Sequence, residues 1–466
     1  LLGALLVLLI PRNFRFVIRI VALFATAISA ICAISLFASF ESGFMPSIPG
    51  GSSYQFEQSI PWVTSVGISY HVGVDGINVG LILMGALVAF AATCVSRSIT
   101  RYEKEFYILL LVMAGGILGA FASLDLFFFY FFHELALVPT FIMIGVWGRG
   151  ENKNYATFQI TLYLSVGALI ALVGLIALYL QLPVDIRTFD IVEITRFFRD
   201  NPMPMDKQRF IFPLLLFGFG ILVSLWPFHT WAPLGYGSAP SATAMLHAGV
   251  LKKFGLYGLI RIAIPLMPEA ARSWIHILAY LCLGNIVYCG WVAMRQRDLN
   301  MLIGNSSVAH MGFCFLGIAS LSLLGITGAV VVMIAHGLLA ALTFALSGYL
   351  YQQTGTLEIK QMGGLLRRMP FVGTCFIIAA MAGCGLPGFG NFVGEVMVLF
   401  SAWKNFSTVT IFAVWGAAVV GAIYMLRAVR NIWHGADLEK YKAVFDAGEN
   451  VSFSFERIWQ KLPYGR

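Results

Sequence analysis

The stretch FFFYFFHELALVPTFIMIGVWG (127–148) decides the fold class, because it is a long apolar run that carries a carboxylate near its middle. A transmembrane helix needs about 20 mostly apolar residues, which this run supplies. Placing a charged side chain such as Glu134 at mid-membrane costs ~2.5–3.5 kcal/mol on insertion scales. A glutamate kept at that cost predicts a part in proton or ion transfer rather than in packing.

Apolar runs of this kind recur along the whole chain. Of its 466 residues 59% are hydrophobic and 11% charged, against ~25% charged in an average soluble domain. The length therefore predicts an all-α polytopic membrane protein with about 13 transmembrane helices, followed by a polar tail. The runs lie at 1–10, 16–40, 76–95, 106–124, 126–147, 156–181, 210–231, 241–266, 273–294, 300–323, 326–350, 370–402 and 408–427.

Basic residues gather in alternate loops, which predicts the orientation. No Lys or Arg occurs between 41 and 76, whereas loops around Arg15, Arg101, Arg149, Arg297 and Arg367 are basic. An excess of Lys and Arg marks cytoplasmic loops, so these loops are expected inside and the N-terminus outside. The exception is 182–209, where five basic residues face five acidic ones. Its segment 185–200 has apolar residues at helical spacing and predicts an amphipathic helix on the membrane surface, or a plain surface helix.

Two spans carry residues that break helices. They are LWPFHTWAPLGYGSAP (225–240) and GCGLPGFGNFVGE (383–395). Proline removes a backbone donor, and in a membrane the freed carbonyls need protein or water partners, so broken helices line cavities. Paired broken helices are typical of transporters built from inverted repeats. We therefore predict inverted five-helix repeats at 106–266 and 267–430, although ordinary proline kinks would give the same pattern.

Further ionisable residues fall inside the apolar runs of the middle region: Lys252, Lys253, Glu395, His229, His247, His310 and His336. Carboxylates, lysines and histidines that are desolvated together exchange protons readily, so the set predicts a proton path. The two adjacent lysines are about 100° apart on a helix, so at most one faces this path. For any single histidine, an interhelical hydrogen bond is the simpler interpretation.

Other kinds of site fit poorly. Four histidines in four different spans do not make a paired haem site, and no nucleophile elbow is present. The seven cysteines form no CxxC motif, so neither a zinc nor an iron–sulfur site is expected.

Several motifs together resemble the antiporter-like proton-pumping subunits of respiratory complex I, and within them the subunit M group. Some are shared with hydrogenase and Mrp-antiporter relatives. Besides the Glu134 run, they are ISYHVGVDGIN (68–78), PFHTW (227–231), LKKFGLYGLIR (251–261), SSVAHMGF (306–313), MIAHGLLAALTF (333–344) and LPGFGNFVGE (386–395).

The resemblance implies fourteen helices, of which the seventh and twelfth are broken, with N-terminal helices at 1–105, the two repeats, and a tail at 431–466. It makes Glu134 the essential glutamate of helix five and Lys253 the central lysine of helix eight. Glu395 would be the proton-exit residue of helix twelve, and His310 and His336 would belong to the central hydrophilic axis.

The resemblance also implies a proton-translocating membrane-arm subunit of an NADH:quinone oxidoreductase, in the bacterial cytoplasmic membrane rather than the mitochondrial inner membrane. No redox cofactor is expected in this chain, because FMN, iron–sulfur clusters and quinone belong to other subunits. Its partners would be neighbouring membrane-arm subunits, and nucleic acid is not expected. The alternatives are a subunit of a hydrogenase, ferredoxin-type complex or Mrp-type antiporter, or a structural subunit that has lost pumping.

This chain departs from the family pattern at three places. Leu222 stands where the family usually has a lysine that pairs with the helix-five glutamate. APLGY (232–236) replaces the usual LPDAH, and His247 and Lys252 stand at positions that are apolar in subunit M. We hypothesise that His247 or Lys252 takes over part of the missing lysine's role. The expected fourteenth helix is also absent, and the sequence starts inside an apolar run, which predicts a longer natural chain.

Overall fold

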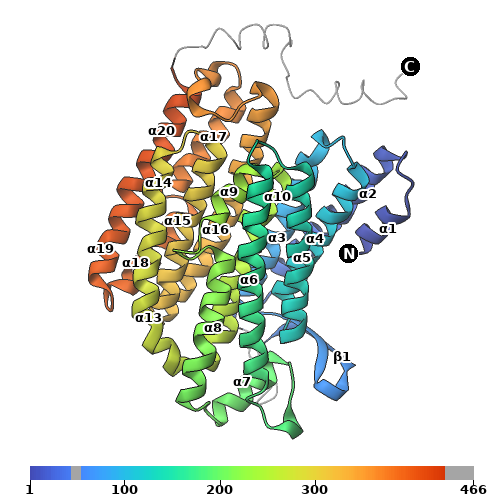
Figure 1. Ribbon diagram of the computed structural model, residues 1–466, viewed down its shortest axis with the longest axis vertical. Helices are drawn as coiled ribbons and strands as arrows, with labels where there is room; N and C mark the ends of the chain where they lie inside the picture. Colours follow the sequence, from blue (N-terminus) through green and yellow to red (C-terminus); the bar gives the residue numbers. More distant parts are fainter. Residues whose placement is uncertain (44–53, 436–466) are drawn as a thin grey trace.

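The computed structural model describes residues 1–43 and 54–435, which form an elongated bundle of roughly parallel and antiparallel helices (Figure 1). In these ranges nine helices are long and apolar enough to cross a membrane, which confirms the polytopic helical prediction. The N-terminal helices are α1 (Leu2–Leu9), α2 (Arg15–Ala38) and α3 (Asn78–Val95). The predicted tail at 431–466 lies mostly outside the described residues.

The predicted first repeat corresponds to α4 (Glu103–Ala122), α5 (Leu126–Trp147), α6 (Lys153–Tyr179), α8 (Met205–Val223), α9 (Trp231–Ser238), α10 (Ser241–Leu246), α11 (Lys253–Gly258) and α12 (Ile264–Leu266). The second contains α13 (Pro268–Leu283), α14 (Cys289–Arg295), α15 (Leu299–Ala319), α16 (Leu323–Thr354), α17 (Pro370–Gly383), α18 (Gly390–Trp403), α19 (Ser407–Trp415) and α20 (Ala422–Trp433). Wider π-helical turns join α10 to α11, α11 to α12, α13 to α14 and α19 to α20.

Both predicted breaks are present. One helix stops at Val223 and resumes at Trp231, and the other stops at Gly383 and resumes at Gly390. Asn285, which is fully buried, closes the first break: its Oδ1 accepts from the Trp226 backbone N–H (2.8 Å). The Nδ2 of Asn285 donates to the carbonyls of Ser224 (2.8 Å) and Val308 (3.2 Å). One side chain thus supplies the partners that interrupted backbone needs within a membrane.

The two halves repeat the same local construction. In each, an aspartate caps the second helix and forms a short β-bridge with the loop that follows the third helix. The bridges are Asp125 with Asp190 and Asp298 with Glu358, each joined by two backbone hydrogen bonds of 2.8–2.9 Å. In each half the third helix packs along the broken one, as α6 does on α8 and α16 on α18. The equivalent bridges support two inverted repeats, while their boundaries at 106–266 and 267–430 stay a prediction.

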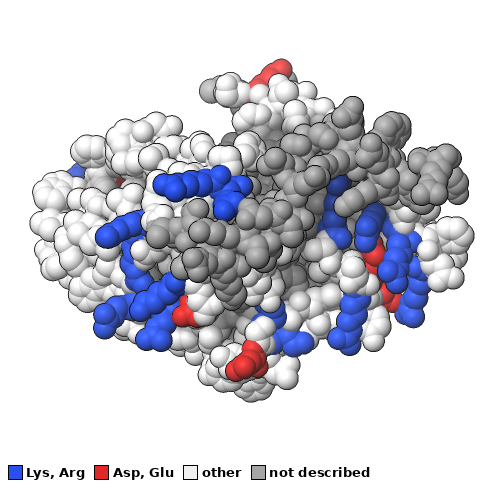
Figure 2. All heavy atoms as spheres, turned by 90° about the horizontal axis from the view of Figure 1, so that it is seen from above, with Lys and Arg blue, Asp and Glu red and all other residues white. Residues whose placement is uncertain are grey.

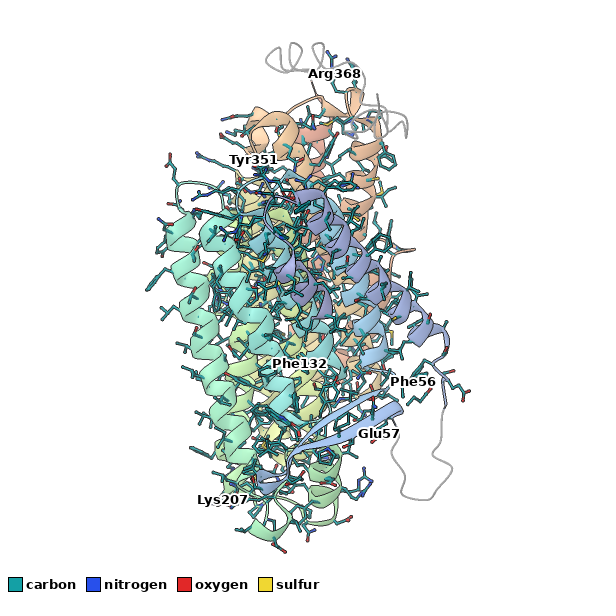
Figure 3. All side chains as sticks on the ribbon, turned by 90° about the vertical axis from the view of Figure 1, so that its right-hand side faces the viewer. Phe56, Glu57, Phe132, Lys207, Tyr351 and Arg368 are labelled. Atoms are coloured by element: carbon teal, nitrogen blue, oxygen red, sulfur yellow. The ribbon has the colours of Figure 1, made fainter. Side chains whose placement is uncertain are left out.

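Basic side chains gather at one end of the bundle, while the orientation in the membrane stays a prediction. Figure 2 looks onto one end of the bundle, where Lys and Arg predominate over Asp and Glu. In Figure 3, Arg368 lies at that end, whereas Lys207, from the exceptional loop, lies at the opposite end. We call these the basic end and the outer end.

One part of the fold was not predicted. The outer end carries an antiparallel hairpin of β1 (Gln55–Val63) and β2 (Ile68–Val74). Its base is held by Asp75, which forms an ion pair with Arg261 of the first repeat (2.7 Å), and Arg261 also donates to the Tyr54 hydroxyl (2.9 Å). Two of the family motifs, VGVDGIN and YGLIR, are therefore joined by a structural contact.

The hairpin is also joined to the segment after α6. His71 of β2 contacts two carboxylates, Asp190 through Nδ1 (2.5 Å) and Glu57 through Nε2 (2.8 Å). The helix predicted at 185–200 is shorter, α7 (Ile191–Asp200). A separate 3₁₀ turn, Val184–Ile186, precedes it, and Asp190 is held extended by the β-bridge. Ile191 and Ile194 are buried against the bundle, so this part of the apolar face packs on protein, and the location of α7 at the membrane surface stays a prediction.

Candidate functional site

The centre of the site is a lysine in a distorted helix. The π-helical turn His247–Leu251 widens the helix just before Lys253, and such turns are frequent at functional sites. Lys253 is fully buried, and its Nζ donates to the Ala248 carbonyl (2.6 Å). The same Nζ lies 3.0 Å from Nδ1 of His336 on α16, which brings the two halves of the molecule into contact.

A line of polar side chains continues from this contact. The rings of His336 and His310 lie 5.3 Å apart between centroids, and Nδ1 of His310 is 3.2 Å from Oε1 of Glu395. All are buried, with at most 5% of each residue exposed. We call Lys253, His336, His310 and Glu395 the central row. The structure therefore brings together four of the residues predicted from the sequence.

The second broken helix makes room for the end of the central row. Gly385 has a left-handed backbone (φ +64°), and a Cβ there would lie 2.7 Å from Oε2 of Glu395. Glycine is thus required both by conformation and by the approach of the carboxylate. A small cavity next to Glu395 and His310 is lined also by Cys384 and Tyr424.

Lys252 points elsewhere, as adjacent positions on a helix require. Its Nζ donates to Oγ of Ser307 on α15 (3.1 Å) and lies 5.5 Å from the ring centre of Tyr236. The ring of His247 is packed between Trp231 (5.5 Å) and Tyr236 (5.4 Å), and its Nδ1 has no hydrogen-bond partner within the described structure. These residues form a second polar group beside the central row.

Glu134 is set apart from both groups. One third of its side chain is exposed (33%), and its Oε1 lies 3.5 Å from Nδ1 of His133. The Tyr130 hydroxyl of the same helix also contacts the Glu134 carboxylate. Leu222, at the position of the expected lysine, is a buried apolar residue. His133 was not among the predicted site residues. It is buried and stacks on Phe254 (4.0 Å), so its place beside Glu134 in the sequence was the available signal.

His229 does not join the central row. Its Nδ1 is 3.2 Å from the Pro227 carbonyl, and its ring meets the edge of Tyr288. This histidine stabilises the broken segment between α8 and α9.

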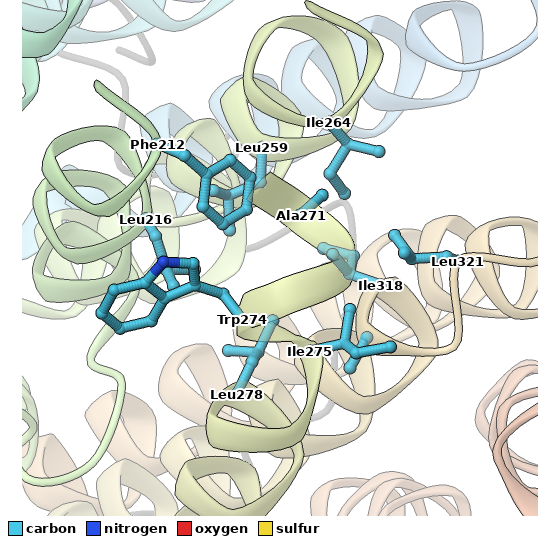
Figure 4. A pocket seen from close by; sticks show the side chains of 11 residues that line it. Phe212, Leu216, Leu259, Ile264, Ala271, Trp274, Ile275, Leu278, Ile318 and Leu321 are labelled. Atoms are coloured by element: carbon cyan, nitrogen blue, oxygen red, sulfur yellow. The ribbon is translucent and has the colours of Figure 1, made fainter. Parts of the chain in front are cut away.

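Other hollows in the bundle have a different chemistry. The pocket between α8, α13 and α15 is lined by apolar side chains such as Phe212, Trp274 and Ile318 (Figure 4). It offers nothing to a polar substrate. Among residues 1–43 and 54–435, no group of three or more His, Cys, Asp or Glu is placed to hold a metal ion.

Comparisons with known proteins agree with this geometry. Residues 123–421 match the family model described as NADH:quinone oxidoreductase/Mrp antiporter, transmembrane. NADH-quinone oxidoreductase subunit M of Rickettsia prowazekii is 34% identical over 404 residues, which cover 84% of this chain and 81% of the relative.

Solved structures give the same result. A chain of respiratory complex I from Thermus thermophilus superposes with a TM-score of 0.83 and 28% identity, covering 96% of this chain and 90% of that one. A chain of the Mrp complex from Dietzia sp. shares the fold alone, with a TM-score of 0.80 and 18% identity over 97% of this chain and 83% of that one. This chain therefore belongs to the NADH:quinone oxidoreductase/Mrp antiporter membrane family.

Proposed function

We propose that this chain is a proton-translocating membrane-arm subunit of an NADH:quinone oxidoreductase of the complex I type. The observation that carries the proposal is the central row, in which four buried ionisable side chains from four helical segments form a continuous line. Each would be costly in a membrane if it served only packing. The named relatives at similar length are subunits of such enzymes.

The contacts support the following route for one proton. Charged Lys253 donates to Nδ1 of His336, which becomes an imidazolium and releases its Nε2 proton towards His310. Nε2 of His310 is buried and has no partner in the described structure, so it is free to accept. His310 then gives its Nδ1 proton to the Glu395 carboxylate, 3.2 Å away. One proton moves, Lys253 is left neutral, and Glu395 becomes a neutral acid.

The broken helices explain why the route is possible. A continuous helix would fill the space beside Glu395 with backbone and side chains, whereas the break leaves Gly385 and a small cavity there. Polar groups held in a low-dielectric interior respond strongly to one another's charge. A change in the charge of Lys253 is therefore felt along the whole central row.

In this proposal the chain carries no redox group. Flavin, iron–sulfur clusters and quinone are assigned to other subunits, and the neighbours of this chain are other antiporter-like membrane subunits. Electron transfer elsewhere supplies the free energy, and this chain supplies a proton path through a multi-span bundle of the cytoplasmic membrane.

The test is Glu395→Gln in native membranes, with NADH-driven quinone reduction and vesicle acidification measured together. We expect acidification per electron to fall, because the amide cannot take the proton that His310 releases. His276→Gln is the matched control, since His276 is exposed on α13 and lies outside the central row. Unchanged acidification in assembled Glu395→Gln complex would overturn the proposal.

A further inference from the structure

The basic end holds a half-buried arginine, with two buried guanidinium nitrogen atoms, that lies outside the proposed proton path. Arg149 follows α5, and its backbone N–H donates to the Ser238 carbonyl at the end of α9 (2.8 Å). Its guanidinium lies over the ring of Tyr351, 4.8 Å from the ring centre. The position of the side chain is thus fixed by three helices of both halves.

Two of the three nitrogen atoms of this guanidinium lack an acceptor within the described residues. Its Nε and Nη2 atoms are buried, and neither has a hydrogen-bond partner within the described residues. Burial lowers the pKa of Arg149, and the negative charge of Asp298 opposes this shift from a longer range. Arginine nevertheless stays protonated in proteins, and buried N–H donors of a charged group that lack an acceptor are unfavourable. The site is therefore suited to an anionic ligand.

A pocket opens next to these nitrogen atoms, and we call it the Arg149 pocket. Ser98, Ser241 and Gln352 form its polar part, whereas Val95, Ile99 and Phe106 form an apolar wall. The pocket lies at the basic end of the bundle, where Figure 3 places Tyr351. A ligand that fits this lining has an anionic head and an apolar part beside it.

We propose that the Arg149 pocket binds a phosphate oxyanion, and that its source is the headgroup of a phospholipid in the cytoplasmic leaflet. A planar guanidinium pairs well with phosphate oxygens, and basic pockets between helices on the cytoplasmic side bind lipid headgroups. The nearby Asp298 carboxylate repels a dianion more than a monoanion, which favours a singly charged phosphodiester over inorganic phosphate. The apolar wall covers the part of a lipid that free phosphate lacks.

The test uses the assembled complex in a phosphate-free maltoside detergent, with hydrogen exchange of peptides from residues 95–102 and 348–354 as the local readout. Phosphatidylglycerol and inorganic phosphate are added in separate arms. We expect the lipid to slow exchange in both peptides and phosphate to have little effect. Arg149→Gln loses this protection, Arg149→Lys keeps part of it, and Arg295→Gln, an exposed basic residue outside the pocket, keeps all of it.

Three outcomes would overturn the proposal. Equal protection by phosphate and lipid leaves an oxyanion site but excludes the lipid as its specific source. Protection already complete in delipidated complex without additive, and lost in Arg149→Gln, shows a protein carboxylate in the site. No protection in either arm excludes an oxyanion site. If Arg149→Gln fails to assemble, Ser98→Glu places a repelling carboxylate at an exposed edge of the pocket, and it should abolish lipid protection without disturbing the bundle.

Discussion

The two halves of the molecule are built alike but connected differently. In the second half, His336, His310 and Glu395 lie in contact with one another and with Lys253. In the first half, Glu134 is one-third exposed and contacts His133, at 3.5 Å, and Tyr130 of its own helix. Both halves have the same aspartate bridge and the same broken fourth helix. The shared fold therefore positions the helices, and the individual side chains decide whether a proton path exists.

The largest difference is expected between the two adjacent lysines. Lys253 belongs to the central row through its contact with His336, whereas Lys252 contacts Ser307. Removing a positioned acid or base slows proton transfer by about 10²–10⁴-fold, so Lys253→Met should nearly abolish proton translocation. Lys252→Met is the matched control, and it should reduce proton translocation less than Lys253→Met does. The measurement is acidification per electron and quinone reduction in membranes with equal amounts of assembled complex; an equal loss in both variants would contradict a path through Lys253 alone.

A second experiment compares the two aspartate bridges. Asp125 accepts hydrogen bonds from the backbone N–H groups of Ser69, Phe127 and Phe128, whereas Oδ1 of Asp298 accepts from Met301. Loss of a helix N-cap costs ~0.5–2 kcal/mol. Asp125→Ala should therefore lower the local opening free energy by about 2 kcal/mol and Asp298→Ala by about 1 kcal/mol.

Hydrogen exchange of the first turns of α5 and α15 measures both costs. Thr195→Ala, a change at a half-buried hydroxyl bonded within its own helix α7, serves as the control. If Asp298→Ala lowers the local opening free energy more than Asp125→Ala does, contacts other than the N-cap hold the bridge of the second half.

A smaller effect is expected at Glu134. Its weak contact with His133 predicts that Glu134→Gln lowers acidification per electron several-fold less than Lys253→Met does. If both quinone reduction and acidification keep their wild-type values, the first half acts as scaffolding.

The hypothesis that His247 or Lys252 replaces the missing lysine has its own test, in which Leu222→Lys is combined with apolar residues at both positions. Loss of pumping in that triple variant would remove its support.

The sequence predicted the helices and their breaks well, because both depend on local features. Apolar length fixes a span, and the prolines and glycines near Pro227 and Pro387 fix the interruptions. The two lysines were also separable from the helical angle alone. The hairpin at 55–74 was missed because its strands are held in place by distant contacts. One of these contacts joins His71 to Asp190, more than a hundred residues away in the sequence. The links from Arg261 to Asp75 and from Arg149 to its pocket depend on tertiary packing in the same way.

The smallest expected effect concerns pH at the outer end. Burial lowers the pKa of His71, but the hydrogen bonds and charges of Asp190 and Glu57 outweigh it and raise the pKa above its ordinary value of 6.5. A raised histidine pKa stabilises the folded state fully below 6.5, and this stabilisation is lost as pH rises through the higher folded value.

The contacts of the hairpin with α7 should therefore loosen as pH rises through that window. Burial also raises the pKa of Asp125 to about 6. A carboxylate shifted in that direction stabilises the fold at low pH, and its contribution is lost between 3.8 and about 6, so it does not contribute in the histidine window.

The equivalent bridge of the second half, at Asp298 and Glu358, contains no histidine. Hydrogen exchange, corrected for its intrinsic pH dependence, should show loosening above pH 6.5 at residues 68–74 but not at 357–361, and His71→Gln should remove it. Equal loosening at both bridges would mean that the two halves respond to pH alike, and that His71 does not distinguish them.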